Sequence, residues 1–180
     1  MMIALVVVGV LLIAFVMVYN SLAQGRVAIN EAHSGIEVQL KRRADLLPNL
    51  VETVKGYTKH ESGVFTEIAQ ARERMLSASS VQDQAKADNM LTGALKSVFA
   101  LAENYPDLKA STNYVSLQSE LSDIEAKISY ARQFYNNNVK SYNSKLVTFP
   151  TNLIANAFGF KAEVFFDADE KDEQPVAVKF

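Results

Sequence analysis

The chain has 180 residues, a formal net charge of −2 at pH 7, and neither cysteine nor tryptophan. The charge balance gives no overall sign of the basic face that nucleic acids require, so we expect no nucleic-acid partner. The lack of cysteine excludes disulfides and thiolate metal sites. The length suits one domain together with a membrane anchor.

The chain begins with an uncharged apolar run, Met1–Tyr19. As a helix this run would extend about 28 Å, close to the hydrocarbon thickness of a bilayer. A cleaved signal peptide, with its cleavage site at residues 21–23, is the competing interpretation. The run is long, however, and no Lys or Arg precedes it. We therefore predict an uncleaved single-pass anchor over residues 1–20, which contacts the lipid bilayer through residues 1–19.

Positive charges near the anchor all lie on its C-terminal side, at Arg26 and then at residues 41–43. The positive-inside rule places such charges in the cytoplasm. It favours a cytoplasmic main domain over a periplasmic or extracellular one.

Apolar residues recur at steps of three and four from residue 21 to about Met75, which predicts a long amphipathic helix. Pro48 lies inside it, and a proline costs a helix interior about 3 kcal/mol, so we expect a kink or a break there. Residues 60–63 are a second candidate break. The serine-rich run 77–80 is typical of a helix end.

Two further helices are predicted, at about Gln82–Asn104 and about Asp107–Thr148, and Pro150 ends the second of them. The segment that follows predicts one short helical turn closed by Gly159. The acidic end of the chain predicts an extended tail. The chain thus divides into the anchor, a bundle over residues 21–150 and a C-terminal segment over residues 151–180.

The predicted helices differ in length, and the middle one is too short to cover both neighbours. Either the first helix breaks near His60, which gives a four-helix up-and-down bundle, or a second chain covers part of the apolar seam. The two explanations are compatible. We expect an all-α fold with a single transmembrane helix and an antiparallel bundle of three to four long helices.

Charged residues interrupt the apolar seam. Arg43 and Glu61 fall on seam positions, and a buried arginine requires an anionic partner because an unpaired buried charge is too costly. Candidate partners are Glu61, Glu120 and Glu125. Together with Arg132, these residues form the predicted structural polar seam.

The basic residues Lys41 and Arg42 stand beside Arg43. Along a straight helix Arg43 lies about 36 Å beyond Tyr19, several Debye lengths from lipid headgroups. A solvated helix face is therefore favoured, with Lys41 and Arg42 as a candidate docking surface for a partner. Asn136 and Asn143, each following a tyrosine at heptad spacing, are further candidates; a structural hydrogen bond between helices is the alternative.

Residues that would carry catalysis do not form a known pattern. After His60-Glu61, Val64 stands where a zinc-binding helix needs its second histidine. No G-x-S-x-G or S-x-x-K pattern accompanies the serines. We predict no catalytic, cofactor-binding or metal-binding residues, no cofactor and no enzymatic activity.

The stretch Gln39–Glu61, QLKRRADLLPNLVETVKGYTKHE, resembles the signature of the LemA family of bacterial membrane proteins. The likeness continues over most of the chain, through Ala71-Arg72, Tyr105-Pro106-Asp107-Leu108-Lys109-Ala110, Leu117-Gln118-Ser119-Glu120-Leu121, Glu125, Arg132-Gln133-Phe134-Tyr135-Asn136, Tyr142-Asn143, Phe149-Pro150-Thr151-Asn152 and Phe158-Gly159-Phe160. The resemblance implies a single N-terminal transmembrane helix in the bacterial cytoplasmic (inner) membrane, and an antiparallel helical bundle. It implies no catalytic residues.

We accordingly predict a non-enzymatic scaffold or adaptor, anchored in the membrane, which forms a homo-oligomer and positions a membrane protein partner. The oligomer is expected from the unequal helix lengths. The first alternative, implied by the family's gene neighbourhoods, is an accessory subunit of a membrane protease or an envelope-stress signalling complex. The remote alternative is a hydrolase with an unrecognised site.

Overall fold

The computed structural model describes residues 1–58 and 61–166, and all regular structure in these ranges is helical. The predicted all-α class is confirmed. The helices are α1 (Met2–Lys55), α2 (Ser62–Ser77), α3 (Val81–Ala102), α4 (Pro106–Lys109), α5 (Thr112–Val147) and α6 (Thr151–Phe158).

The described residues form two compact units. One, the anchor unit, contains Met1–Ser34 and Gln133–Phe165. The other, the bundle unit, contains Gly35–Arg132 and Phe166. α1 and α5 each contribute residues to both units, whereas α2, α3 and α4 belong wholly to the bundle unit and α6 to the anchor unit.

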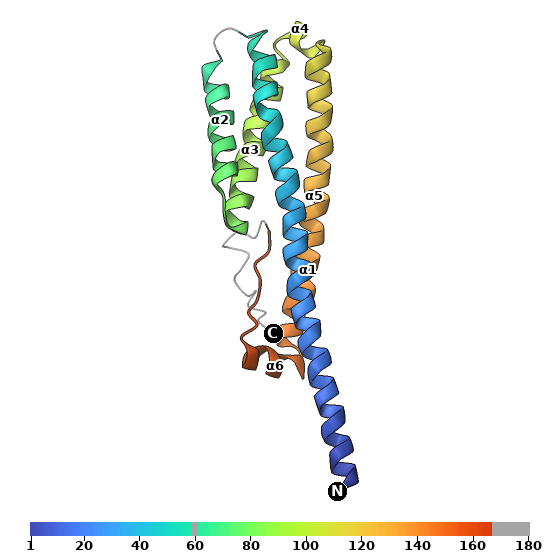
Figure 1. Ribbon diagram of the computed structural model, residues 1–180. Helices are drawn as coiled ribbons and strands as arrows, with labels where there is room; N and C mark the ends of the chain where they lie inside the picture. The colour runs from blue at the N-terminus through green and yellow to red at the C-terminus, as the bar shows by residue number, and fades with distance from the viewer. Residues whose placement is uncertain (59–60, 167–180) are drawn as a thin grey trace, which may run out of the picture. The chain divides into compact units, whose positions relative to one another are not determined.

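The bundle unit is built from the C-terminal part of α1, from α2 and α3, and from the N-terminal part of α5, with successive long helices running antiparallel (Figure 1). The break between Lys55 and Ser62 creates α2, so the four-helix up-and-down arrangement is confirmed for this unit. Apolar side chains spaced by three and four residues form its core because each helix presents one apolar stripe. They include Leu40, Leu47, Leu50 and Val54 of α1, Ile68 and Ala71 of α2, Leu91, Leu95 and Val98 of α3, and Leu121, Ile124 and Ile128 of α5.

α1 continues through Pro48 without a break. Proline has no N–H, so the carbonyl of Ala44 loses its usual partner four residues ahead. Arg72 of α2 replaces that partner, because its Nε donates a hydrogen bond to the Ala44 carbonyl oxygen at 3.1 Å. A residue distant in sequence thus satisfies the acceptor that Pro48 leaves open. The kink expected at Pro48 stays a prediction.

The helix expected from about Asp107 to Thr148 is divided into α4 and α5, so a single helix over that range was a wrong prediction. Pro106 occupies the first position of α4, where its missing N–H costs nothing. α4 ends after one turn, and its cap residue Ala110 donates to the carbonyl of Pro106 at 3.0 Å. The spacing of apolar residues in the sequence gives no sign of this short interruption.

The anchor unit has its own small core. Leu22, Ile29 and Ala32 of α1 and Tyr135, Val139 and Tyr142 of α5 are all buried. α1 and α5 approach closely at Gly25, where an added Cβ would lie 3.1 Å from Cδ2 of Tyr142. Glycine at this position lets the tyrosine ring pack on the α1 backbone.

α6 ends at Gly159, as the sequence predicts. Gly159 adopts the left-handed conformation (φ 71°), and its N–H donates to the carbonyl of Ala155. The following segment is bound to α5: the side chain of Asn143 exchanges two hydrogen bonds with the Glu163 backbone, at 2.8 and 2.9 Å. The Tyr135 hydroxyl donates to the Val164 carbonyl at 2.9 Å. The predicted acidic tail lies outside the described residues.

The N-terminal part of α1 is long and apolar enough to cross a membrane. Its most apolar 18-residue window has a mean hydropathy of 3.0, and none of that window is buried inside the structure. Such a surface is unfavourable in water, since burying apolar surface stabilises by about 25 cal/mol per Å². The apolar helix therefore indicates membrane anchoring, in agreement with the sequence.

Candidate functional site

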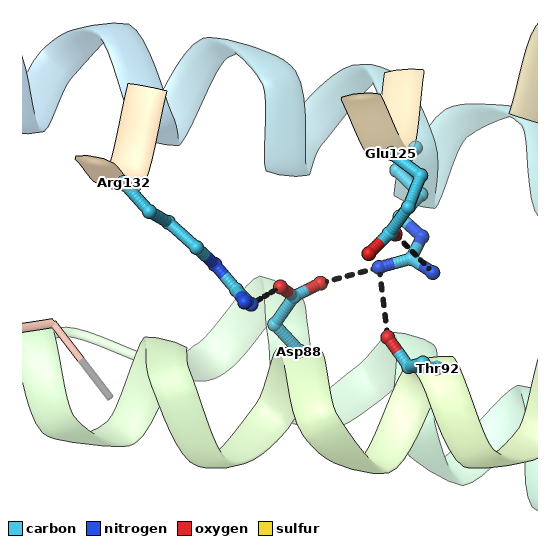
Figure 2. Close-up of polar contacts among 5 residues, drawn as sticks. Asp88, Thr92, Glu125 and Arg132 are labelled. Carbon is cyan, nitrogen blue, oxygen red and sulfur yellow. Dashed lines mark hydrogen bonds and ion pairs between the residues drawn. The ribbon is translucent and has the colours of Figure 1, made fainter. Parts of the chain in front are cut away.

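Four charged side chains and one threonine meet between the helices of the bundle unit, and we call them the buried polar cluster after its two buried members (Figure 2). Charged side chains are rarely buried unless they are paired. Within the cluster, Asp88 is fully buried and Arg43 is 3% exposed, whereas the side chains of Arg132 and Glu125 are 18% and 45% exposed. Its members are Arg43, Asp88, Thr92, Glu125 and Arg132.

Arg43 is the centre of the cluster. Its Nη1 donates to Asp88 Oδ1 at 2.7 Å and to Thr92 Oγ1 at 3.1 Å, and its Nη2 lies 2.8 Å from Glu125 Oε2. Arg132 Nη2 donates to the other carboxylate oxygen of Asp88. Figure 2 shows Glu125 and Arg132 reaching from α5 towards Asp88 and Thr92 on α3. One carboxylate thus joins α1, α3 and α5.

Helical spacing explains how the chain assembles the cluster. Asp88 and Thr92 are four residues apart on α3, and Glu125 and Arg132 are seven residues apart on α5. Both spacings place side chains on the same face of a helix. The cluster therefore occupies one face of α3 and one face of α5, with Arg43 of α1 bound to both.

The charges within the cluster balance, because two guanidinium groups meet two carboxylates. Burial lowers the pKa of the Arg43 guanidinium from its usual value, and the nearby Glu125 carboxylate opposes that shift. Arginine remains protonated at neutral pH even so. Both carboxylates bind guanidinium groups that come from other helices, so the arrangement suits helix pairing.

The predicted polar seam is brought together only in part. Arg43, Glu125 and Arg132 meet in the cluster. Glu61 instead accepts a hydrogen bond from the Tyr105 hydroxyl at 3.3 Å. Glu120 is exposed on α5. Of the three carboxylates considered for Arg43, the structure supplies Glu125 alone.

Asp88, the most buried member, was missed by the sequence analysis. It lies three residues before Leu91 and seven before Leu95, both buried, and therefore on the apolar face of α3. This position on the apolar face of a predicted helix is the signal that would have identified it. Local periodicity cannot reveal which helices face one another, so the pairing itself was not predictable.

Candidate docking residues differ in their surroundings. Lys41 and Arg42 are exposed on α1. Asn143 is held by the backbone of Glu163, which lies outside the helices, so this bond does not join two helices. Asn136 is partly exposed on α5.

Acidic side chains outside the cluster do not gather into a metal site. Among residues 1–58 and 61–166 there is no group of three or more His, Cys, Asp or Glu side chains that could hold a metal ion. His60 lies outside the described residues. On α5 the Asp123 carboxylate pairs with Lys127, one turn ahead, at 2.6 Å, and both side chains are at least half exposed. These two residues form part of a solvated helix face.

Fold and site together define a class: an all-α protein with an apolar N-terminal anchor helix and a bundle whose interior is ion-paired. The LemA family matches residues 32–180, and the chain belongs to that family. The resemblance noted in the sequence is thereby confirmed.

Three relatives illustrate the range of similarity. Protein LemA of Metamycoplasma hominis is 31% identical over 168 residues, which covers 91% of this chain and 75% of the relative. Magnetosome protein MamQ 2 of Paramagnetospirillum magneticum is 24% identical, with 96% of this chain and 75% of the relative covered. Magnetosome protein MamQ of Magnetospirillum gryphiswaldense is 23% identical, with 92% and 72% covered.

Proposed function

We propose that this LemA-family chain is a non-enzymatic scaffold or adaptor of the bacterial cytoplasmic membrane. It forms a homo-oligomer and holds a membrane protein partner through the exposed basic residues Lys41 and Arg42, on the cytoplasmic side. The observation that supports this proposal most directly is the buried polar cluster. Its charges compensate one another and join α1, α3 and α5, which supports a structural role for the bundle.

The relatives are consistent with a role that depends on shape. One is named for the LemA family and others as magnetosome proteins, so related chains serve in different settings. A scaffold can be transferred between settings by changing its exposed residues while its interior is kept. Function then depends on the surface, and the fold alone does not determine it.

Cross-linking in intact cells followed by mass spectrometry tests the proposal. We expect cross-links between copies of the chain, and cross-links from the bundle unit to a membrane protein and to cytoplasmic peptides. Blue-native electrophoresis in mild detergent should show a species larger than one chain. A monomer at native expression, without cross-links between copies, would refute the oligomer. A stoichiometric protease or signalling protein would instead favour the accessory-subunit alternative.

The docking surface can be tested by charge reversal. The double variant Lys41→Glu/Arg42→Glu should lose the cross-links to the partner, because both side chains are exposed and a reversed charge repels an acidic surface. Its matched control is Lys86→Glu/Lys96→Glu, which reverses two exposed charges on α3. Equal loss of cross-links in both variants would show that Lys41 and Arg42 have no special role.

A further inference from the structure

Four aromatic rings of the anchor unit gather between the anchor helix and α6. Phe158, the last residue of α6, has its ring centroid 5.5 Å from that of Phe15 and 5.3 Å from that of Tyr19. The ring centroid of Phe160 lies 5.6 Å from that of Tyr19. Gly159 makes this possible, because its left-handed turn ends the helix and directs the next aromatic residue back to α1.

These contacts fix the depth of α6 relative to a membrane. Phe15 and Tyr19 form the last turn of the apolar run, so in a membrane-spanning helix they lie at the boundary between hydrocarbon and headgroups. A residue in contact with both rings lies at the same depth. The C-terminal end of α6 is therefore at the bilayer surface whenever α1 spans the bilayer.

The large side chains that α6 and the residue before it leave uncovered are apolar, and the polar Asn156 is exposed beside them. Phe149, just before the helix, is 80% exposed, Leu153 is 61% exposed and Phe158 is 54% exposed. On the side of α6 opposite Leu153, Ala155 is buried in the core of the unit. The helix contains no charged residue, and its axis crosses the direction of α1 (Figure 1). A helix in the membrane plane beside a transmembrane helix has this orientation.

Basic residues flank the helix. Lys145 donates to the Ser21 hydroxyl at 3.0 Å, just beyond the end of the apolar run, and Lys161, three residues after α6, is exposed. Lysine amines at this level meet lipid headgroups, while their stems and the apolar side chains reach deeper.

We propose that α6 and Phe149 form a second membrane contact, an interfacial helix inserted at the headgroup–hydrocarbon boundary beside the anchor. The partner is the lipid bilayer itself. The contact rests on the membrane anchor of the proposed function but not on its oligomer or its protein partner. It would fix the orientation of the anchor unit at the membrane surface, because a single transmembrane helix leaves the unit free to rotate about the axis of that helix.

Tryptophan fluorescence tests the proposal, because the chain has no tryptophan of its own. Phe149→Trp and Leu153→Trp are made singly in the full chain, which is reconstituted into vesicles containing lipids brominated near the headgroup end of the acyl chain. Phe134→Trp is the matched control, since Phe134 is an exposed aromatic residue of α5 in the same unit. Val8→Trp, within the apolar run, reports insertion of the anchor.

We expect the brominated lipids to quench the Phe149→Trp and Leu153→Trp variants strongly and the Phe134→Trp variant little, with blue-shifted emission for the first two. Quenching in both α6-region variants no greater than in Phe134→Trp would overturn the proposal. In that case, access of aqueous acrylamide would mean that α6 faces water, and protection from it would mean that a protein covers α6. A Val8→Trp variant that aqueous acrylamide quenches freely would overturn the anchor itself, and with it both proposals.

Discussion

Arg43 bonds to two carboxylates and a hydroxyl while its side chain is almost fully buried. Removing one partner of a buried ion pair leaves the other charge uncompensated in a medium of low polarity. We therefore expect Arg43→Ala to lower the free energy of unfolding by about 3–5 kcal/mol. Chemical unfolding of the full chain in detergent micelles, followed by circular dichroism, measures this change.

The neighbouring arginine provides the control. Arg42 is exposed, and surface substitutions usually change stability by less than about 0.5 kcal/mol. Similar losses in Arg42→Ala and Arg43→Ala would contradict the burial and pairing of Arg43.

Tyr135 gives a prediction for alkaline pH. Burial, reinforced by the Glu163 carboxylate, raises its pKa from 10.0 to about 12. The unfolded chain therefore ionises this phenol first, and the stability that the neutral hydroxyl contributes is present below pH 10 and lost as the pH rises to about 12. The stability advantage of the native chain over Tyr135→Phe should shrink across this interval.

Thermal unfolding of both chains at a series of pH values measures that difference. Other groups that titrate in the same pH range contribute equally to the stability of both chains, so their contribution cancels in the difference. An advantage that stays constant, or grows, from pH 10 to about 12 would contradict the role assigned to the Tyr135 hydroxyl.

At the scale of the element, α1 depends on a bond from another helix. Arg72 of α2 donates to the Ala44 carbonyl that Pro48 leaves without a partner. An unsatisfied acceptor that is shielded from water costs about 1–3 kcal/mol. We expect Arg72→Ala to destabilise the native chain by about this amount, and much less in a Pro48→Ala background, where the new N–H of residue 48 can bond to Ala44.

A double-mutant cycle on Pro48 and Arg72 isolates this coupling. The four chains are compared by chemical unfolding under the same conditions. If Arg72→Ala costs the same with Pro48 as with alanine at that position, the hydrogen bond does not compensate for the proline.

For the molecule as a whole, the buried polar cluster raises the question of what it contributes beyond stability. Apolar residues of similar size often replace buried ion pairs without loss, or stabilise by about 1–4 kcal/mol. We expect the fourfold variant Arg43→Met/Asp88→Leu/Glu125→Leu/Arg132→Met to be more stable than Arg43→Ala. It should, however, specify its helix pairing less strictly, and nuclear magnetic resonance spectra of the two chains in micelles would show this as broadened or multiple signals.

The singly substituted Arg43→Ala chain is the reference for that comparison. A fourfold variant that is less stable than Arg43→Ala, or that gives spectra as sharp as the native chain, would argue against a role in specifying the pairing.

Much of the fold could be predicted because it depends on local patterns. The apolar run to Tyr19, the turn closed by Gly159 and the interruption before Ser62 each follow from residues adjacent in sequence. The site depends on relations between helices. Arg43 could be recognised as buried, but its partner Asp88 lies on another helix, 45 residues away, and no periodicity along one helix encodes that pairing.

The bond between Arg72 and Ala44 also bears on the order of events during synthesis. Ala44 leaves the ribosome 28 residues before Arg72. The helical turn around Pro48 is therefore synthesised before the Arg72 side chain that donates to the Ala44 carbonyl. Residues before Ala44 can form helix as soon as they emerge from the ribosome, while the anchor is inserted in lipid. Residues beyond Pro48 should become protected only when α2 has formed, and pulse-labelled hydrogen exchange would record that delay as a later rise in protection. One helix in the finished molecule is then the product of two separate folding steps.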